Sequence, residues 1–456
     1  ITIHTVGTGV STDAWRDLLT HIANETDGEN HFTTEPDFDL NQFYTEHLVT
    51  ALSGTTIELV DFRNGEINRG EQQKIESFRI NRFAKKASFV LAWRKPFGKT
   101  ELGMRILSPR GLEITPSAVQ DGGYYRIATF DLPLEPQMTA NGVISSEHYG
   151  VWRMIIDPRH IAQETAVYDA LLLVDEPRLK YTFEIEKRDY ATGDTIPIHV
   201  RVTENGEAIR SMSKVEAQVF RPSLGVGTFL SENPVSDDQL GSDPGLHQDR
   251  FPTLAEKKAY LLVQDPDLRK QLQAQTENIQ LYDDGLAEHG DEIANDGIYS
   301  AQYSNTEYPG SYAFEFDVAG HSRFNGDFNR SRRVETQVRI QGADVDETSV
   351  SFTVLEETAD GRVVLISATP RDQFGNYLGP GYQQVIDVTT SAGVFQGPLQ
   401  DKLDGSYSRE LRLASGVDPN ITITVQDAKV FDDALSEMSP EVGLWSASFH
   451  LGAAIP

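Results

Sequence analysis

The chain of 456 residues contains no cysteine, which excludes disulfide bonds, thiolate metal sites and cysteine nucleophiles. Basic residues are scarce as well, since 40 lysines and arginines face 69 aspartates and glutamates and leave a formal net charge of −29. This charge would repel phosphates, so nucleic acid is not an expected partner. The acidity suits solubility in a salty exterior and the binding of cations.

The chain also lacks the sequence patterns of several large protein classes. No apolar run approaches the roughly 18 residues of a membrane-spanning helix. The motifs H-E-x-x-H and G-x-S-x-G, the Walker loop and the Rossmann fingerprint are absent, so we expect no enzyme active site in this chain. The sequence opens on Ile1, with neither an initiator methionine nor a signal-peptide pattern at its start, and we therefore expect a fragment or a processed product.

What the chain does contain is globular and mostly β-patterned. Its composition is 39% hydrophobic and 24% charged, and its length predicts about three domains. From Thr55 onward, short alternating segments are separated by Gly, Pro and Asn turns, which is typical of β-sandwiches. The predicted fold class is mainly β: several immunoglobulin-like β-sandwiches preceded by a partial α/β segment.

The N-terminal 54 residues carry an α/β pattern. Strand patterns at 1–10 and 31–36 are each followed by an amphipathic helix pattern, the second capped by Asp39. The segment resembles the last part of a von Willebrand A domain through I-x-I-x-T-V-G-x-G, L-x-x-I-A-x-x-T-x-G and D-L-x-x-F. The D-x-S-x-S loop that holds the metal of such domains is absent, so that metal site cannot be assigned here.

The apolar stripes of these two helices need a cover that half a domain cannot supply. We therefore expect a partner: another polypeptide, or a missing N-terminal segment that completes the von Willebrand A-like domain.

Three β-modules are predicted after this segment. In the first, F-x-L-x-W, L-x-P-x-G and G-x-W-x-x-x-I follow in an order that resembles the β-sandwich after the A domain in proteins similar to calcium-activated chloride-channel regulators. In the last, P-R-D-x-F-G-N and D-G-S-Y resemble immunoglobulin-like and filamin-like repeats. The predicted boundaries are 55–175 for a β-sandwich, 176–340 for an immunoglobulin-like sandwich and 341–436 for an immunoglobulin-like or filamin-like sandwich.

The second module is predicted to contain an insertion. The stretch 225–249 is rich in Gly, Pro, Ser and Asp and predicts a surface loop. A capping box at 253–256 and the Asp265-Pro266 pair then open two short helices. We expect this helical insertion near 253–277, just before an acidic loop at 283–297.

The acidic loop is the strongest chemical signal in the sequence. Two turns, Asp-Asp-Gly and Asn-Asp-Gly, enclose His289-Gly290-Asp291 between strand-like flanks, and such carboxylate density suits Ca²⁺. The spacing differs from that of an EF-hand, and a pair of solvated turns is the alternative. The loop resembles the DDG, GD and A-x-DG-x-Y pattern of immunoglobulin-like modules in bacterial surface proteins. The candidate calcium ligands are Asp283, Asp284, Asp291, Asn295 and Asp296.

The tail at 437–456 carries an alternating pattern. Trp445, Phe449 and Leu451 alternate with small or polar residues, as in a strand of an outer-membrane barrel. An edge strand of the last sandwich is the alternative. On the first interpretation, a C-terminal extension anchors the protein in an outer membrane.

Two functions fit these patterns. The first is a non-enzymatic adhesion or scaffold protein, extracellular or on a bacterial cell surface, whose β-modules present a von Willebrand A-type binding domain. The second is the non-catalytic C-terminal portion of a processed metalloprotease-type surface protein. An H-E-x-x-H motif upstream of Ile1 would favour the second.

Overall fold

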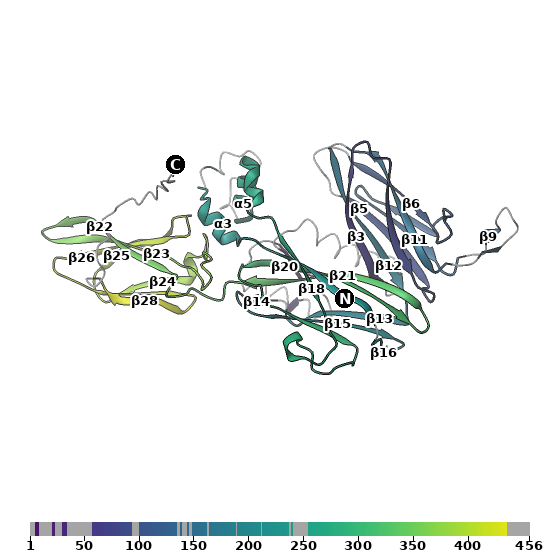
Figure 1. Ribbon diagram of the computed structural model, residues 1–456. Helices are drawn as coiled ribbons and strands as arrows, with labels where there is room; N and C mark the ends of the chain where they lie inside the picture. The colour runs from purple at the N-terminus through teal and green to yellow at the C-terminus, as the bar shows by residue number, and fades with distance from the viewer. Residues whose placement is uncertain are drawn as a thin grey trace, which may run out of the picture. The chain divides into compact units, whose positions relative to one another are not determined.

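The computed structural model describes residues 5–8, 21–22, 30–33, 57–93, 100–134, 137–138, 144–145, 148–161, 164–187, 189–210, 212–236, 239 and 254–435. It is mainly β, as expected (Figure 1). The chain divides into two compact units. The first comprises Ile1–Arg221, Ala274–Thr306 and Ser311–Gln337, and the second comprises Pro222–Gln273, Glu307–Gly310 and Val338–Pro456.

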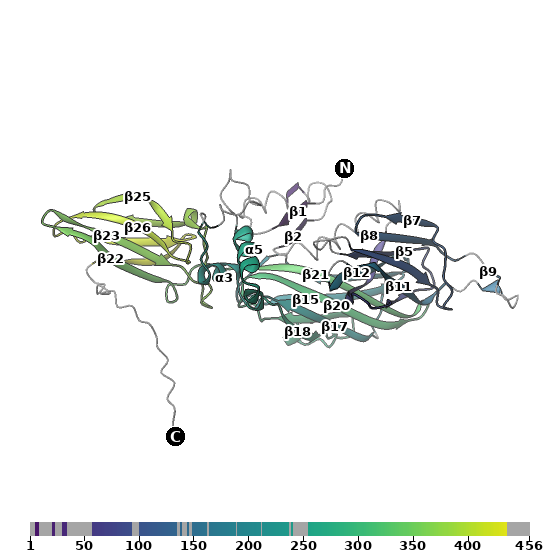
Figure 2. The same cartoon turned by 90° about the horizontal axis from the view of Figure 1, so that it is seen from above.

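The first sandwich packs a three-stranded sheet, ordered β4-β11-β6, and a five-stranded sheet, ordered β3-β12-β5-β8-β7. Figure 2 shows β12, β5, β8 and β7 side by side. Its core holds Phe89, which contacts Phe78, Phe130 and Trp152 at ring centroid distances of 5.8–5.9 Å. The strands are β3 (Glu58–Asn68), β4 (Lys74–Ile80), β5 (Lys86–Trp93), β6 (Glu101–Leu107), β7 (Ala118–Asp121), β8 (Tyr125–Asp131), β11 (Gly150–His160) and β12 (Thr165–Asp175), with the short pair β9 (Gln137–Met138) and β10 (Ile144–Ser145).

Strand β12 was not predicted, because its sequence does not alternate. It lies between β3 and β5, and seven consecutive residues from Tyr168 to Val174 are buried. Leu172 packs in the sandwich core, whereas Leu171 and Leu173 join a second apolar cluster. A strand that is apolar on both faces loses the period of two on which sequence prediction depends.

The second sandwich follows its predicted alternation closely. Strand β15 shows a buried residue at every second position from Ile196 to Glu204. One sheet has the order β13-β15-β16 with β19 also paired to β15, and the other has the order β14-β21-β20-β17-β18. The strands are β13 (Leu179–Ile185), β14 (Asp189–Ala191), β15 (Ile196–Glu204), β16 (Glu207–Ala208), β17 (Met212–Arg221), β18 (Gln275–Gln280), β19 (Ile298–Tyr303), β20 (Gly310–Ser322) and β21 (Gly326–Arg339).

The third sandwich belongs to the second unit. Its sheets have the orders β22-β23-β26-β25 and β24-β27-β28. Tyr407, on the predicted D-G-S-Y turn, is buried, and its hydroxyl donates to Gly379 O while accepting from Tyr382 N. The strands are β22 (Ser349–Thr358), β23 (Gly361–Thr369), β24 (Ile386–Thr390), β25 (Val394–Asp401), β26 (Tyr407–Ala414), β27 (Asn420–Val425) and β28 (Ala428–Ala434), with the 3-10 helix η3 (Gln383–Val385).

The helices lie partly where the sequence predicts them. Helix α5 (Leu254–Gln264) and the 3-10 helix η1 (Pro266–Lys270) follow the two predicted start signals. The predicted loop after Gly225 is wrong in its first part, because α3 (Val226–Glu232) forms there. Phe229 of α3 is fully buried, and Thr228 Oγ1 accepts from Tyr377 N of the third sandwich. This apolar packing outweighs the loop-like composition of the stretch.

In the N-terminal segment, β1 (Thr5–Thr8) pairs in parallel with β2 (Asn30–Thr33). Most of the two predicted helices of this segment lies outside the described residues, as does the tail at 437–456. No helix in the described ranges is long and apolar enough to cross a membrane.

Candidate metal centre

The acidic loop connects β18 to β19 and is closed at its base. Tyr282 and Ser300 form an isolated antiparallel bridge, in which each backbone N–H donates to the carbonyl of the other residue at 2.9 and 2.8 Å. Leu281 and Ser300 are each 1% exposed. Both ends of the loop are therefore fixed to the second sandwich, and its turns project from a rigid base.

Residues with positive φ make the turns of this loop. Gly285 has φ 72°, Asn295 has φ 61° and Gly297 has φ 87°, values that only Gly and Asn adopt at low cost. Gly297 also lies against β16, because a Cβ at this position would meet Ala208 Cβ at 2.7 Å. The Asp-Asp-Gly and Asn-Asp-Gly sequences thus bend the chain so that the carboxylates of Asp283 and Asp296 lie close together.

Three carboxylates converge inside the loop. One carboxylate oxygen each from Asp283, Asp291 and Asp296 lies within 4.8 Å of the others. Asp291 is 5% exposed, and the other two are half-buried. Like charges this close repel one another unless protons or a cation offset them.

Backbone amides orient the three carboxylates. Asp283 accepts from Asp296 N at 3.1 Å and from Gly297 N at 3.0 Å. Asp291 accepts from Gly285 N at 2.6 Å, and Asp296 accepts from Ile298 N at 2.9 Å. These bonds fix the side chains, and each carboxylate keeps further lone pairs for a ligand because it offers about four acceptor sites.

Asp284, another candidate ligand, points elsewhere. It accepts from Leu286 N at 3.1 Å, and its other oxygen lies 2.9 Å from His289 Nδ1. The His289 ring stacks on Tyr282 at a centroid distance of 4.1 Å. Asn295, the fifth candidate, is exposed, and its backbone N–H donates to Asp283 O at 3.4 Å. The structure therefore brings together three of the five candidates and pairs Asp284 with His289.

The geometry of the triad fits a calcium ion. Calcium binds oxygen at roughly 2.4 Å, so two ligands on opposite sides of one ion lie up to about 4.8 Å apart. The three carboxylate oxygens fall within that separation. Carboxylate oxygens are also the hard ligands that Ca²⁺ prefers, and backbone carbonyls and water complete its shell in protein sites.

A second polar cluster, which no sequence pattern predicts, joins the first sandwich to the second. We call it the joint; its residues are Asp61, Arg63, Asn81, Arg330 and Ser331. Ser331 Oγ donates to Asp61 Oδ1 at 2.6 Å and accepts from Phe62 N at 3.1 Å. Arg330 donates to Asn81 Oδ1 at 2.9 Å, and Arg63 forms an ion pair with Asp61.

Burial dominates the electrostatics of the joint. Asp61 is 2% exposed and Arg330 is 1% exposed. Burial raises the pKa of Asp61, an effect opposed by the charge of Arg63 and the hydrogen bond from Ser331. Burial likewise lowers the pKa of Arg330, opposed by the charges of Tyr181, Glu176 and Asp61. The two sandwiches thus share buried, charged, hydrogen-bonded groups.

Contacts around the joint extend the interface. Tyr181 of β13 donates its hydroxyl to Leu59 O of β3, and Lys180 pairs with Glu58 at 2.5 Å. The guanidinium carbon of Arg178 lies 3.7 Å from the centroid of the Phe83 ring. No local sequence pattern predicts the contacts of the joint, because its residues come from distant parts of the chain: Asp61 and Ser331 are 270 positions apart.

The sequence was compared with protein-family models and with curated proteins. No protein-family model matches the chain, and no curated protein matches it.

Solved structures show distant similarity. The lipase BlEst2 of Bacillus licheniformis in its propeptide form is 10% identical over 62% of this chain and has a TM-score of 0.30; the chain covers only 42% of it. A DUF4785 family protein of Legionella pneumophila is 11% identical, with 83% of this chain and 93% of that protein covered and a TM-score of 0.33. The Escherichia coli adhesin FdeC is 11% identical, with coverages of 83% and 97% and a TM-score of 0.29. At TM-scores this low, none of the three carries an argument about function.

Proposed function

We propose that this chain is a non-enzymatic scaffold of an extracellular or cell-surface adhesion protein, in which locked β-modules hold a von Willebrand A-type binding domain away from the cell envelope. The observation that carries the proposal is the joint, where buried charged groups bind across two sandwiches. Sandwiches joined only by a solvated linker would be free to reorient. A scaffold that presents a binding domain needs a fixed orientation between its sandwiches.

The joint supplies directional contacts. Hydrogen bonds and bidentate ion pairs depend on angle as well as on distance. A buried polar group that loses its partner destabilises the protein by its desolvation free energy. Reorienting the sandwiches would separate Arg330 from Asn81 and Ser331 from Asp61 at once. The two modules therefore behave as a single rigid body in this proposal.

The second part of the proposal is calcium at Asp283, Asp291 and Asp296. A bound cation would offset the repulsion among the three carboxylates and fix the loop on the second sandwich. Extracellular modules bind calcium at about 10⁻⁴–10⁻³ M, so such a site would be filled outside a cell. Calcium then stabilises the scaffold and takes no part in a reaction.

The absence of cysteine from the chain makes the scaffold proposal directly testable. Cysteines introduced at exposed Gln120 of the first sandwich and exposed Asn278 of the second would carry the only two spin labels. Double electron–electron resonance should give one narrow distance distribution. The same labels on an Arg330→Met variant should give a broad distribution, because the joint has lost its buried donor.

The matched control is Arg159→Met in the same labelled background. Arg159 is an exposed arginine that pairs with Glu101 at 3.2 Å on the first sandwich, so its loss should leave the distribution narrow. A broad distribution in the unsubstituted chain, or equal widths for all three proteins, would overturn the scaffold proposal.

A further inference from the structure

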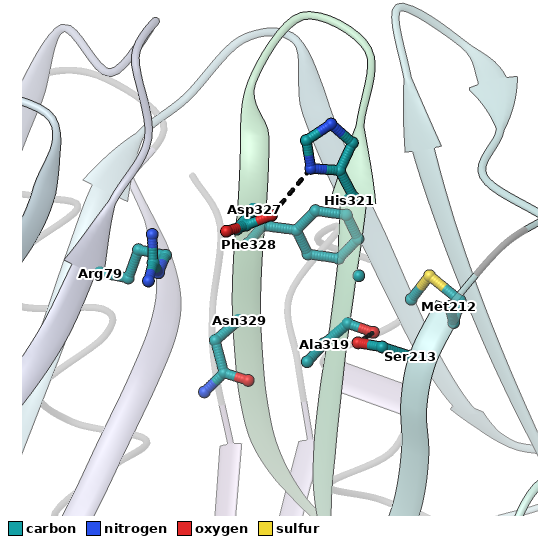
Figure 3. Close-up of a pocket in the computed structure, with 9 residues that line it drawn as sticks. Arg79, Met212, Ser213, Ala319, His321, Asp327, Phe328 and Asn329 are labelled. Atoms are coloured by element: carbon teal, nitrogen blue, oxygen red, sulfur yellow. Dashed lines mark hydrogen bonds and ion pairs between the residues drawn. The ribbon is translucent and has the colours of Figure 1, made fainter.

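A hollow of about 460 Å³ lies beside the β20–β21 hairpin. Figure 3 shows Arg79 on one side of it, Met212 and Ser213 on the other, and the two strands of the hairpin between them. Ser213 lies at a register shift between β17 and β20, and its hydroxyl donates to Ala319 O at 3.1 Å. Such bulges interrupt the regular ladder and are common next to binding sites.

Arg79, His321 and Asp327 are the ionisable residues that line this hollow, and the sequence on either side of it is basic although the chain has a net charge of −29. Its two bordering segments, FRINRFAKK at 78–86 and HSRFNGDFNRSRR at 321–333, together contain one acidic residue, Asp327. Arg82 and Arg323 are exposed, and Arg79 is half-buried. Within the described residues the guanidinium of Arg79 forms no hydrogen bond or ion pair, whereas those of Arg63, Arg105, Arg126 and Arg159 in the same sandwich all pair with carboxylates.

The single carboxylate of the hollow is already engaged. Asp327 Oδ1 lies 2.8 Å from His321 Nδ1, the contact drawn in Figure 3. The pKa of Asp327 is below its ordinary value, chiefly because of this hydrogen bond and to a lesser extent through the charges of His321 and Arg79. The guanidinium of Arg79 acts on Asp327 through its charge, but it forms no ion pair with any carboxylate in the described part of this acidic chain.

Aromatic side chains accompany the exposed arginines. The guanidinium carbon of Arg82 lies 5.7 Å from the centroid of the Tyr149 ring, and that of Arg323 lies 5.4 Å from the centroid of the Phe324 ring. Tyr149 is 45% and Phe324 47% exposed. Arg, Tyr, Phe and Met are the residue types enriched at protein–protein interfaces.

Buried Glu204 holds the hairpin tip in place. Its Oε1 accepts from Ser322 Oγ at 2.7 Å, Asn325 N at 3.1 Å and Asn325 Nδ2 at 3.0 Å, and its Oε2 accepts from Phe324 N at 3.3 Å. Asn81 Nδ2 also donates to Asp327 O at 3.1 Å, which connects the end of β4 to the hairpin. The surface is therefore preorganised, which lowers the entropic cost of binding.

We propose that this hollow, with its flanking pairs Arg82–Tyr149 and Arg323–Phe324, binds an extended acidic segment of a partner protein. A carboxylate of the partner pairs with Arg79, and a neighbouring apolar side chain lies over Met212 and Ala319. Repulsion from the distant carboxylates of the chain is screened at physiological salt beyond about 8 Å, whereas contact pairs are screened much less. The apolar lining favours a protein segment over a purely charged polyanion.

The test is fluorescence anisotropy with a fluorescein-labelled peptide that alternates glutamate and leucine. The full chain should bind it, and replacing every glutamate of the peptide by glutamine should weaken binding about tenfold or more. Arg79→Gln should cause a similar loss, whereas Arg159→Gln, with the same change of charge in the same sandwich, should not. Ala319→Tyr should also weaken binding by filling the hollow without a change of charge.

Three results would overturn the proposal: no binding of the peptide, equal binding by the Arg79→Gln variant, or displacement of the peptide by heparin at equal charge concentration. The last result would show a preference for polyanions in general. This inference goes beyond the scaffold function and does not depend on it. The resonance experiment measures the rigidity of the joint, and the anisotropy experiment measures peptide binding at the hollow. Either proposal can therefore fail while the other stands.

Discussion

The joint and the acidic loop both gather ionisable side chains between strands, yet they do so in opposite ways. At the joint, Asp61 and Arg330 are buried among groups of opposite charge or complementary hydrogen bonding. In the loop, Asp283, Asp291 and Asp296 face one another as like charges. Opposite charges that pair with one another indicate a structural contact, whereas we propose that the like charges converging in the loop bind a cation.

The largest effect is expected at the joint. Arg330→Met leaves Asn81 Oδ1 without its donor and removes a buried positive charge that acts on Glu176 and Asp61. Removing one partner from such a buried set costs about 3–5 kcal/mol of unfolding free energy. Urea unfolding would measure the loss. Arg159→Met is the surface control, for which at most about 1 kcal/mol is expected; equal losses for the two variants would contradict the role of the joint.

The next effect concerns calcium. A site filled at a hundred times its dissociation constant raises the unfolding free energy by about 2.7 kcal/mol. We expect that gain for the unsubstituted chain and none for Asp283→Asn, measured by thermal unfolding with and without calcium. Asp284→Asn is the matched control, because Asp284 pairs with His289 outside the triad. If Asp284→Asn also abolished the stabilisation by calcium, the assignment of Asp283 but not Asp284 to the calcium site would be wrong.

A smaller effect is expected on the pH dependence of the unfolding free energy, through Asp61 of the joint. Because burial raises the folded-state pKa of Asp61, the folded protein binds this proton more readily than the unfolded chain. The contribution of Asp61 to stability is therefore fully present below its unfolded pKa of about 3.9 and is lost as pH rises through the raised folded value. Relative to Asp61→Asn, the unsubstituted chain should gain stability when the pH of urea unfolding experiments falls from 7 toward 4. A relative loss over that range would contradict the assignment.

The smallest effect is expected at His289. Its pair with Asp284 is partly exposed, with side-chain exposures of 28% and 34%, and such pairs contribute about 0–1 kcal/mol. His289→Gln should therefore change the unfolding free energy little and leave calcium affinity unchanged in calorimetry. A large loss of calcium affinity would make His289 part of the site.

The sequence predicted the loop well because all of its determinants are local. Asp283, Gly285, Asp296 and Gly297 lie within fifteen positions of one another, and their turn chemistry follows from residue type. What the sequence could not show is the orientation of Asp284, which depends on the stacking of His289 against Tyr282.

The joint could not be predicted, for a physical reason. Asp61 and Ser331 are 270 positions apart, and each is an ordinary polar residue in its own strand. Strand β12 was missed because burial on both faces removes its alternation, and α3 because the burial of Phe229 outweighs the loop-like composition around it. Alternation in β15, by contrast, followed directly from one buried face.

The most direct test of the distinction between the two regions is a calcium titration by calorimetry of three proteins: the unsubstituted chain, Asp283→Asn and Asp61→Asn. Circular dichroism would first establish that each is folded. We predict that the unsubstituted chain and Asp61→Asn bind calcium with the same dissociation constant, about 10⁻⁴–10⁻³ M, and that Asp283→Asn does not bind. No calcium binding by the unsubstituted chain, or equal binding by Asp283→Asn, would contradict the assignment of calcium binding to the acidic loop.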